Sequence, residues 1–442
     1  MTLREDVEKL VPAVLEDLQR LVSIQSVGAD PARAGELQRS AEAVAGLVRD
    51  LGCLDVRIAH AGGAPAVIAR FPAPPGKPTV CLYAHHDVQP EGDPGDWATE
   101  PFTAVTRGDR MFGRGVADDK GGLAVHLAAL RYFGGRPPVG VTLFVEGEEE
   151  VGSPTLTALL ATNADDLAAD VYVIADSLNW SVGAPAFTTS LRGLADCVVE
   201  VRTLDHPIHS GSFGGVVPDA LTTLCRLLAT LHDEVGNVAV SGLRAGPGPD
   251  LDYPADRLRI ESGILDGVHY IGDGTVVERI WTRPALSVIA LDATPISEAS
   301  NTLIPAARAK LSLRVAPGDD AVRALGLLTE HLRSHAPWGA QISVIPGDLG
   351  QPSVVPFAGP YAEAAQAAVR EAWGVEPVLI GQGGSIPMVA EFADTFPEST
   401  VLVTAVSDPD SRMHGVNESL HLGEFASACV AETLFLATLS QQ

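Results

Sequence analysis

Five short, continuously apolar runs constrain the fold of this chain more than any other feature. They are Thr79–Ala84, Val141–Val145, Val171–Ala175, Pro377–Ile380 and Thr400–Val406. Because these runs do not alternate with polar residues, they are typical of strands that are buried on both faces of a sheet. Stretches with helical periodicity lie between them. The pattern predicts an α/β fold, with a doubly wound domain built on a mainly parallel sheet.

The middle of the chain has a different pattern. Residues 194–201 and 306–315 alternate between apolar and polar side chains, and amphipathic helices are expected beside them. Strands with two helices packed on one face predict a small α+β domain. We therefore expect one α/β domain formed by residues 1–187 and 353–442, interrupted by an inserted α+β domain at residues 188–352.

Composition excludes several classes of partner. The 442 residues include 56 acidic and 30 basic side chains, which gives a net charge of −26. Such a charge argues against nucleic acid and against anionic membrane surfaces as partners. No apolar run is long enough to span a membrane, and the N-terminal residues have no apolar core typical of a signal peptide. Five scattered cysteines without a CxxC pair favour a reduced, cytoplasmic protein.

Acidic and histidine side chains follow the predicted strands at the point where each strand ends. His85 and Asp87 follow the first apolar run, the acidic run Glu146–Glu150 follows the second, and Asp176 follows the third. The loop after the last run carries His414. Because the carboxyl ends of parallel strands meet at one edge of a sheet, we expect these groups to lie close together. Carboxylates at this density would repel one another without a cation, so the sequence predicts a metal site.

A glycine-rich segment, Met111–Gly122, lies between the first two of these strands. It begins with Gly113-x-Gly115, the first half of a dinucleotide-binding fingerprint, but Asp118 occupies the position of the third glycine. A carboxylate there would face the pyrophosphate, so we reject dinucleotide binding. The chain also lacks GxSxG, HExxH and GxxxxGK[ST] motifs, which disfavours a serine hydrolase, a zincin and a P-loop enzyme.

Seven motifs together carry a family resemblance that covers nearly the whole chain. In order they are YAHHDVQP, MFGRGVADDKGG, EGEEEVGS, IADS, DHPIHSGSFGG, SNTLIP and GQGGSIP. The chain resembles the co-catalytic zinc peptidases, which include carnosinases, bacterial dipeptidases, aminoacylase, carboxypeptidase G and succinyl-diaminopimelate desuccinylase. The dipeptidase and carnosinase branch matches best. The resemblance implies a catalytic α/β domain with two adjacent metal ions and an inserted lid domain that often dimerises.

The resemblance also implies a role for each residue of the metal site. The implied ligands of two divalent ions per subunit are His85, Asp118, Glu150, Asp176 and His414. Asp118 would bridge the ions, with a cis peptide bond to Asp119, while Asp87 would orient His85 and Glu149 would be the general base. Because three glutamates are consecutive, a shift of one residue would make Glu148 the base and Glu149 the ligand. Zinc suits such mixed nitrogen and oxygen ligands, and cobalt or manganese are alternatives.

Further residues are implied to bind the substrate. His209 of the inserted domain would reach the active site of the other subunit of a homodimer, and Asn301 and Arg314 would contact the substrate. Gly384 and Ser385 would line the pocket for its carboxylate. Simpler roles stay open for two of them, because Arg314 could form a surface salt bridge and His209 could be an exposed loop residue.

Two neighbouring polar residues have simpler interpretations. His86 is expected to be a strand-end histidine that is satisfied by the backbone. Asp119 is expected to cap a helix that begins near Gly122, since aspartate commonly accepts a hydrogen bond at that position.

The resemblance thus implies a hydrolase that cleaves the amide bond of dipeptides. Glu149 would take a proton from the attacking water and pass it to the leaving amine. Two alternatives remain. One is a deacylase of N-acyl amino acids on the same scaffold, and the other is a non-catalytic metal-binding relative.

Overall fold

The computed structural model describes residues 2–441, which form two compact units. The large unit contains the residues up to Thr189, Val355–Ile380 and the residues from Pro387 onward. The small unit contains Ser190–Val354 and Gly381–Ile386. The sequence-based boundaries at 188 and 352 stay a prediction, and they did not anticipate that residues 381–386 group with the small unit.

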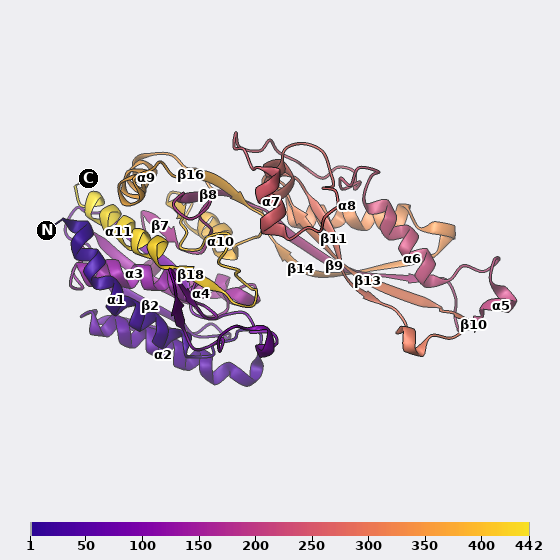
Figure 1. Ribbon diagram of the computed structural model, residues 1–442, viewed down its shortest axis with the longest axis horizontal. Helices are drawn as coiled ribbons and strands as arrows, with labels where there is room; N and C mark the ends of the chain where they lie inside the picture. The colour runs from indigo at the N-terminus through magenta and orange to yellow at the C-terminus, as the bar shows by residue number, and fades with distance from the viewer. Residues whose placement is uncertain (1, 442) are drawn as a thin grey trace. The chain divides into compact units, whose positions relative to one another are not determined.

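The large unit combines the N-terminal half of the chain with its C-terminal end (Figure 1). Its helices are α1 (Leu3–Val22), α2 (Ala34–Asp50), α3 (Lys120–Tyr132), α4 (Leu156–Leu167), α9 (Pro360–Trp373), α10 (Pro387–Thr395) and α11 (Leu422–Leu439). The strands of its main sheet are β1 (Asp55–Ala59), β2 (Ala66–Phe71), β3 (Thr79–His85), β6 (Gly140–Glu146), β7 (Val171–Ile174), β8 (Ala186–Leu191), β16 (Val378–Gln382) and β17 (Thr400–Val403). A smaller sheet contains β4 (Val105–Arg107), β5 (Arg110–Phe112) and β18 (Ser419–His421).

The main sheet has a parallel centre, as the continuous apolar runs predict. Its strands follow the order β1-β2-β6-β3-β7-β17-β8-β15, in which β15 is Ser353–Val354, and β16 pairs with β8. Strands β6, β3, β7 and β17 are parallel to one another. The edges are antiparallel, because β2 joins β6 and β8 joins β17 in the opposite direction. The α/β prediction with a mainly parallel sheet is therefore confirmed.

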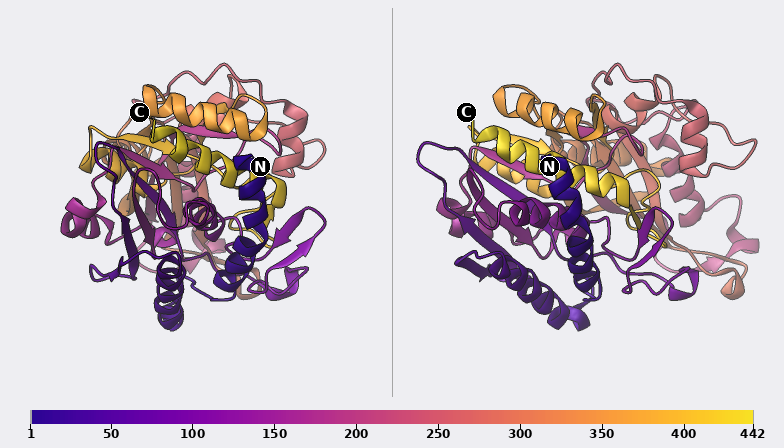
Figure 2. Two further views of the ribbon diagram at one scale, coloured as in Figure 1. Left: turned by 90° about the vertical axis from the view of Figure 1, so that its left-hand side faces the viewer. Right: turned by 60° about the vertical axis from the view of Figure 1, so that its left-hand side comes forward.

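Helices cover both faces of this sheet, so its central strands are buried. One face carries α1, α2, α3, α9 and α11, and α1 packs against α11 although they lie at opposite ends of the chain (Figure 2). The other face carries α4 and α10, where Phe392 of α10 packs on Tyr83 of β3, Phe144 of β6 and Tyr172 of β7. Burial of these apolar surfaces stabilises the edge of the sheet at which the polar loops converge.

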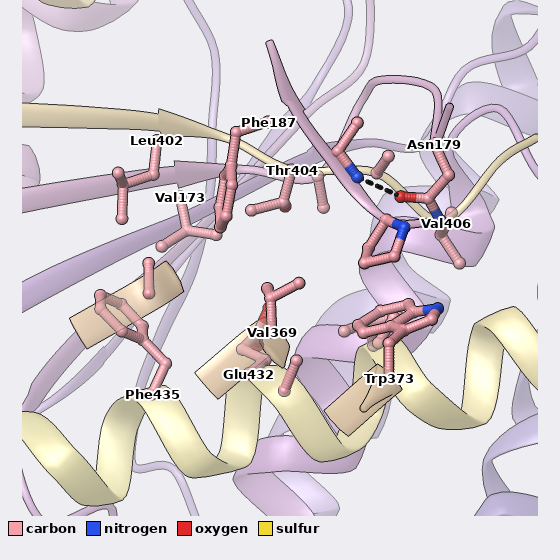
Figure 3. A pocket seen from close by; sticks show the side chains of 18 residues that line it. Val173, Asn179, Phe187, Val369, Trp373, Leu402, Thr404, Val406, Glu432 and Phe435 are labelled. Carbon is pink, nitrogen blue, oxygen red and sulfur yellow. Dashed lines mark hydrogen bonds between the residues drawn. The ribbon is translucent and has the colours of Figure 1, made fainter. Parts of the chain in front are cut away.

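Helix α11 is the most apolar helix of the large unit. By length and composition it is the one helix among residues 2–441 that could cross a membrane, but most of it is buried. A cavity of about 50 Å³ separates it from β7 and β17, and Val369, Trp373 and Phe435 line that cavity (Figure 3). Its lining is mostly apolar and includes none of the predicted metal ligands.

The small unit is a sheet with two helices packed on one face. The sheet has the order β11-β13-β9-β14, with β9 (Gly193–Arg202), β11 (Ala285–Asp292), β13 (Ala306–Val315) and β14 (Gln341–Gly350) all antiparallel. Helices α6 (Ala220–Leu228) and α8 (Ala321–Ser334) bury their apolar sides against β9 and β13. The remaining helices and strands of this unit are α5 (Ser210–Phe213), α7 (Ala255–Ser262), β10 (Ile208–His209) and β12 (Thr302–Leu303).

Candidate metal centre

The polar residues that follow the parallel strands converge at one edge of the main sheet. His85 is the last residue of β3 and is fully buried. It lies beside Glu146, the last residue of β6, in the parallel register of these strands. Strand β7 flanks β3 on the other side and is followed by Asp176. Parallel pairing therefore delivers a histidine, the acidic run and an aspartate to one place, as expected.

Two groups of potential metal ligands form there and share one residue. The first contains His85, Asp118 and Asp176, and the second contains Asp118, Glu150 and His414. In each group the ligand atoms lie within 4.8 Å of one another. Within residues 2–441, these groups contain all five of the predicted ligands.

Asp118 connects the two groups through its two carboxylate oxygens. Its Oδ1 lies 3.1 Å from Nε2 of His85, and its Oδ2 lies 3.0 Å from Nε2 of His414. Nε2 of His414 is also 3.3 Å from Oε2 of Glu150, and Nε2 of His85 is 4.0 Å from Oδ2 of Asp176. A carboxylate that turns one oxygen toward each group is suited to bridge two cations. The peptide bond between Asp118 and Asp119 is cis.

Asp87 holds both the histidine and the acidic run. Nδ1 of His85 lies 3.1 Å from the backbone oxygen of Asp87 and 3.4 Å from its Oδ1. The Asp87 carboxylate also accepts hydrogen bonds from the backbone N–H groups of Glu149 and Glu150, at 3.2 and 3.1 Å. The sequence predicts the contact with His85 but not the contact with the acidic run, because the latter depends on the pairing of β3 with β6.

The three consecutive glutamates point in different directions. Glu148 turns away from the cluster, because its carboxylate accepts hydrogen bonds from the backbone N–H of Ala64 at 2.9 Å, from the backbone N–H of Thr155 at 2.7 Å and from the Thr155 hydroxyl. Glu150 faces His414. Within residues 2–441, no hydrogen-bond donor holds the Glu149 carboxylate. This arrangement favours Glu149 as base and Glu150 as ligand over the assignment one residue earlier.

The electrostatics of the cluster fit a bound cation. Burial raises the pKa of Glu149 well above its ordinary value, and the neighbouring Asp176 carboxylate raises it further. Burial also raises the pKa of Asp176 and, together with the charge of Asp118, the pKa of Glu150. The hydrogen bonds of His414 to Asp118 and Glu150 raise its pKa to about 10. Because these carboxylates repel one another when ionised, a divalent cation among them would relieve the repulsion.

Two neighbouring residues test the simpler interpretations. His86 is fully buried, and its Nε2 lies 2.8 Å from the backbone oxygen of Pro65, so the backbone satisfies it as expected. The prediction for Asp119 is wrong in its chemistry. Helix α3 begins at Lys120, and Asp119 occupies the capping position without forming a side-chain cap. Its Oδ2 instead accepts a hydrogen bond from the backbone N–H of His85 at 3.3 Å, which draws the side chain toward the sheet.

The predicted substrate-binding residues all belong to the small unit. His209 ends β10 and pairs with Thr302 of β12, beside Asn301, whose backbone oxygen accepts a hydrogen bond from Ser210. His209 is exposed, and its Nδ1 accepts a hydrogen bond from the backbone N–H of Gly211 at 3.1 Å. Two short strands thus present His209 and Asn301 together.

Arg314 lies on β13 and forms no salt bridge with the residues that the structure describes. Burial lowers its pKa. Burial and the charge of Arg314 lower the pKa of Arg192 to about 10. Arg192 donates to the backbone oxygen of Gly383, next to Gly384 and Ser385. No sequence motif marks Arg192, because only the fold brings the start of β9 near residues 381–386.

An α/β sheet whose carboxyl edge carries two overlapping groups of potential metal ligands is suited to a metal-dependent hydrolase. A family model described as peptidase family M20/M25/M40 matches residues 81–438. A cysteinylglycine-S-conjugate dipeptidase from Corynebacterium striatum is 33% identical over 432 residues, which cover 96% of this chain and 95% of that protein. The human β-Ala-His dipeptidase is 28% identical, with 85% of this chain and 78% of that protein covered.

Solved structures give the same result for the fold. The di-peptidase Dug1p from Saccharomyces cerevisiae superposes with a TM-score of 0.85 at 24% identity, covering 100% of this chain and 98% of that one. Human carnosine dipeptidase 1 superposes with a TM-score of 0.80 at 24% identity, covering 100% and 99%. The chain belongs to peptidase family M20/M25/M40. The resemblance drawn from the seven motifs, and its best match to the dipeptidase branch, are thereby confirmed.

Proposed function

We propose that this chain is a two-metal dipeptidase that hydrolyses the amide bond of dipeptides. The observation that carries the proposal is the sharing of Asp118 by two groups of potential ligands, with Glu149 beside them and held by no donor among the described residues. Curated relatives along nearly the whole chain are named as dipeptidases, which supports this substrate class.

The chemistry of the donors supports two divalent ions, with zinc as the proposed metal and cobalt or manganese as substitutes. His85, Asp118 and Asp176 would hold one ion, and Asp118, Glu150 and His414 the other. Imidazole nitrogens and carboxylate oxygens are ligands that zinc accepts readily. When bound, such ions polarise a substrate carbonyl and make water a better nucleophile at neutral pH.

Glu149 is the proposed general base. Burial and the neighbouring Asp176 carboxylate raise its pKa, which makes the carboxylate a stronger base. Glu149 takes a proton from the attacking water and then delivers it to the leaving amine, so the carboxylate is regenerated at the end of the cycle. Asp87 positions Glu149 and His85 at the same time, through the Glu149 backbone N–H and the His85 ring.

Arg314 is proposed to recognise the free carboxylate of the substrate. It carries a positive charge with no acidic partner among the described residues, and its planar guanidinium suits a carboxylate. Gly384 and Ser385 are proposed to line the same pocket. Asn301, which directly precedes β12, is proposed to contact the substrate beside His209 of the paired strand β10.

His209 is proposed to act in the active site of the partner subunit of a homodimer. The outer strand of the small sheet, β11, supports such an assembly. It is an edge strand, and the side chains of Val288, Ile289 and Leu291 are 45, 55 and 46% exposed. An uncovered edge with apolar side chains is disfavoured in an isolated subunit and stabilised by pairing with another chain.

The acidic net charge and the unpaired cysteines support a cytoplasmic protein that binds neither nucleic acid nor membranes.

Hydrolysis of a dipeptide library tests the proposal directly. The purified protein is assayed with dipeptides and with N-acetyl and N-succinyl amino acids, before and after chelation and after addition of zinc, cobalt or manganese. We expect dipeptide cleavage that chelation abolishes and a divalent metal restores. Preference for N-acyl amino acids would identify a deacylase instead. Full activity of a protein shown by elemental analysis to be metal-free would refute the metal-dependent mechanism.

A further inference from the structure

The glycine-rich turn that resembles half of a dinucleotide fingerprint does bind an anion, but the anion belongs to the chain itself. The Glu418 carboxylate is fully buried in this turn. It accepts hydrogen bonds from the backbone N–H groups of Gly115 at 3.0 Å, Ala117 at 3.0 Å and Asp118 at 3.1 Å. Nη1 of Arg114 donates to it at 2.7 Å. Its two oxygens are thus occupied by donors from one loop.

The close approach of this turn requires glycine at position 115. Gly115 has a φ of +85°, a conformation that side chains disfavour. A Cβ atom there would also lie 2.7 Å from Cγ1 of Val88. The glycine therefore lets the backbone turn its N–H groups inward, where successive donors form an anion-binding concavity.

Glu418 and Arg114 connect two loops of the candidate metal centre. One loop carries Asp118 and the other carries His414. Glu418 lies four residues after His414 and binds the backbone of Asp118. Nη2 of Arg114 donates to the backbone oxygen of Gly415, beside His414, at 3.1 Å, and to that of Pro90 at 3.1 Å. One buried ion pair therefore ties the loop after β3, the Asp118 loop and the His414 loop together.

We propose that Glu418 is a positioning residue of the metal centre, which fixes the backbone of Asp118 relative to His414 so that both reach the same ion. The proposal rests on the proposed function of Asp118 and His414 as ligands. Glu418 itself touches no metal or substrate, because its carboxylate is taken up by Arg114 and the loop N–H groups. Interactions that orient metal ligands from behind typically change metal affinity or activity by about 10- to 100-fold when removed.

Glu418→Gln tests the proposal with little change in shape. The amide loses the charge that Arg114 pairs with, and its NH2 group faces backbone donors. Glu432→Gln is the matched control, because Glu432 is also buried in the large unit and forms an ion pair with His126, at 2.8 Å. Both variants lose a buried charge pair, but Glu432 lies on α11 and contacts none of the proposed ligands.

The measurements are the zinc dissociation constant of the full-length protein, by competition with a chromophoric chelator, and kcat and KM at saturating zinc. We expect Glu418→Gln to bind zinc at least about tenfold more weakly and to lose kcat with KM nearly unchanged. Glu432→Gln should lower the melting temperature while leaving zinc affinity and kcat at the wild-type values. Wild-type zinc affinity and kcat in a folded Glu418→Gln protein would overturn the proposal.

If Glu418→Gln does not fold, Glu418→Asp is the variant that tests the proposal. It keeps the charge for Arg114 but withdraws the carboxylate by one methylene, so the hydrogen bond to Asp118 should weaken and zinc affinity should fall. Wild-type zinc affinity in Glu418→Asp would then overturn the proposal. A wild-type protein that binds none of zinc, cobalt or manganese would refute the proposed function instead, so the two failures are distinguishable.

Discussion

Glu148, Glu149 and Glu150 provide a matched set of substitutions, because they are the same residue type at consecutive positions. Replacing each by glutamine removes a charge and preserves the volume. The three carboxylates have different surroundings, so the three variants should fail in different ways. The contrast tests the assignment of base and ligand against the alternative that is shifted by one residue.

Glu149→Gln should lose turnover and little else. General base catalysis contributes about 10²- to 10⁴-fold, which corresponds to roughly 2.7 to 5.4 kcal/mol in the activation free energy. No donor among the described residues holds this carboxylate, and its neighbour Asp176 repels it. The folded metal-free protein should therefore be as stable as the wild type or more stable, and zinc content should be unchanged.

The other two variants serve as internal controls. Glu148→Gln weakens hydrogen bonds from Ala64 and Thr155 to a buried carboxylate, so the free energy of unfolding should fall by about 1 to 3 kcal/mol while kcat stays near the wild-type value. Glu150→Gln should reduce the zinc content.

The assays are kcat and KM on a dipeptide, zinc per subunit by elemental analysis, and denaturant unfolding of the chelated proteins. If Glu149→Gln loses zinc and Glu148→Gln loses turnover with normal stability, the assignment is wrong by one residue. Full turnover in Glu149→Gln with zinc bound would refute the general-base role itself.

Three further predictions concern other parts of the molecule. Arg314→Ala should mainly raise KM for dipeptides with a free carboxylate; equal cleavage of amidated and free dipeptides by the wild type would contradict a carboxylate clamp. Homodimers of His209→Ala and of Glu149→Ala should each be nearly inactive. Refolding the two variants together should restore roughly a quarter of wild-type activity, because half of the dimers are then mixed and each mixed dimer has one intact site of two. If mass measurements confirm subunit exchange and no activity returns, His209 does not act in trans. Burial lowers the pKa of His126, but the charge and hydrogen bond of Glu432 outweigh burial and raise the net pKa above its ordinary value. The stabilisation of the folded protein by the charged His126–Glu432 pair is therefore complete below the unfolded histidine pKa of about 6.5, and it is lost as the pH rises through the higher folded pKa. In denaturant titrations, the difference in unfolding free energy between wild type and Glu432→Gln should therefore narrow with rising pH. A difference that widens with rising pH would contradict this prediction.

Local patterns in the sequence were enough to predict the α/β class and the edge of the sheet at which the candidate metal ligands gather. Continuous apolar runs indicate strands buried on both faces, and a polar residue directly after such a run must emerge at the end of the strand. His85 and Asp176 could be placed in this way without knowing the strand order. Parallel strands place their carboxyl ends at one edge, so the clustering of these residues follows from topology alone.

Only the tertiary structure decided how side chains within that cluster are directed. Glu148 and Glu149 are equivalent in the sequence, but the backbone N–H groups of Thr155 and Ala64 draw Glu148 away, and Ala64 lies 84 residues earlier in the chain. Asp119 has the sequence signature of a helix cap but turns to the backbone of His85. In the sequence, the Gly113-x-Gly115 turn resembles a ligand-binding loop. In the structure, it binds the carboxylate of Glu418, which lies about 300 residues later in the chain. Hydrogen bonds between distant segments leave no periodic pattern in the sequence, because their partners are brought together by the packing of the whole domain.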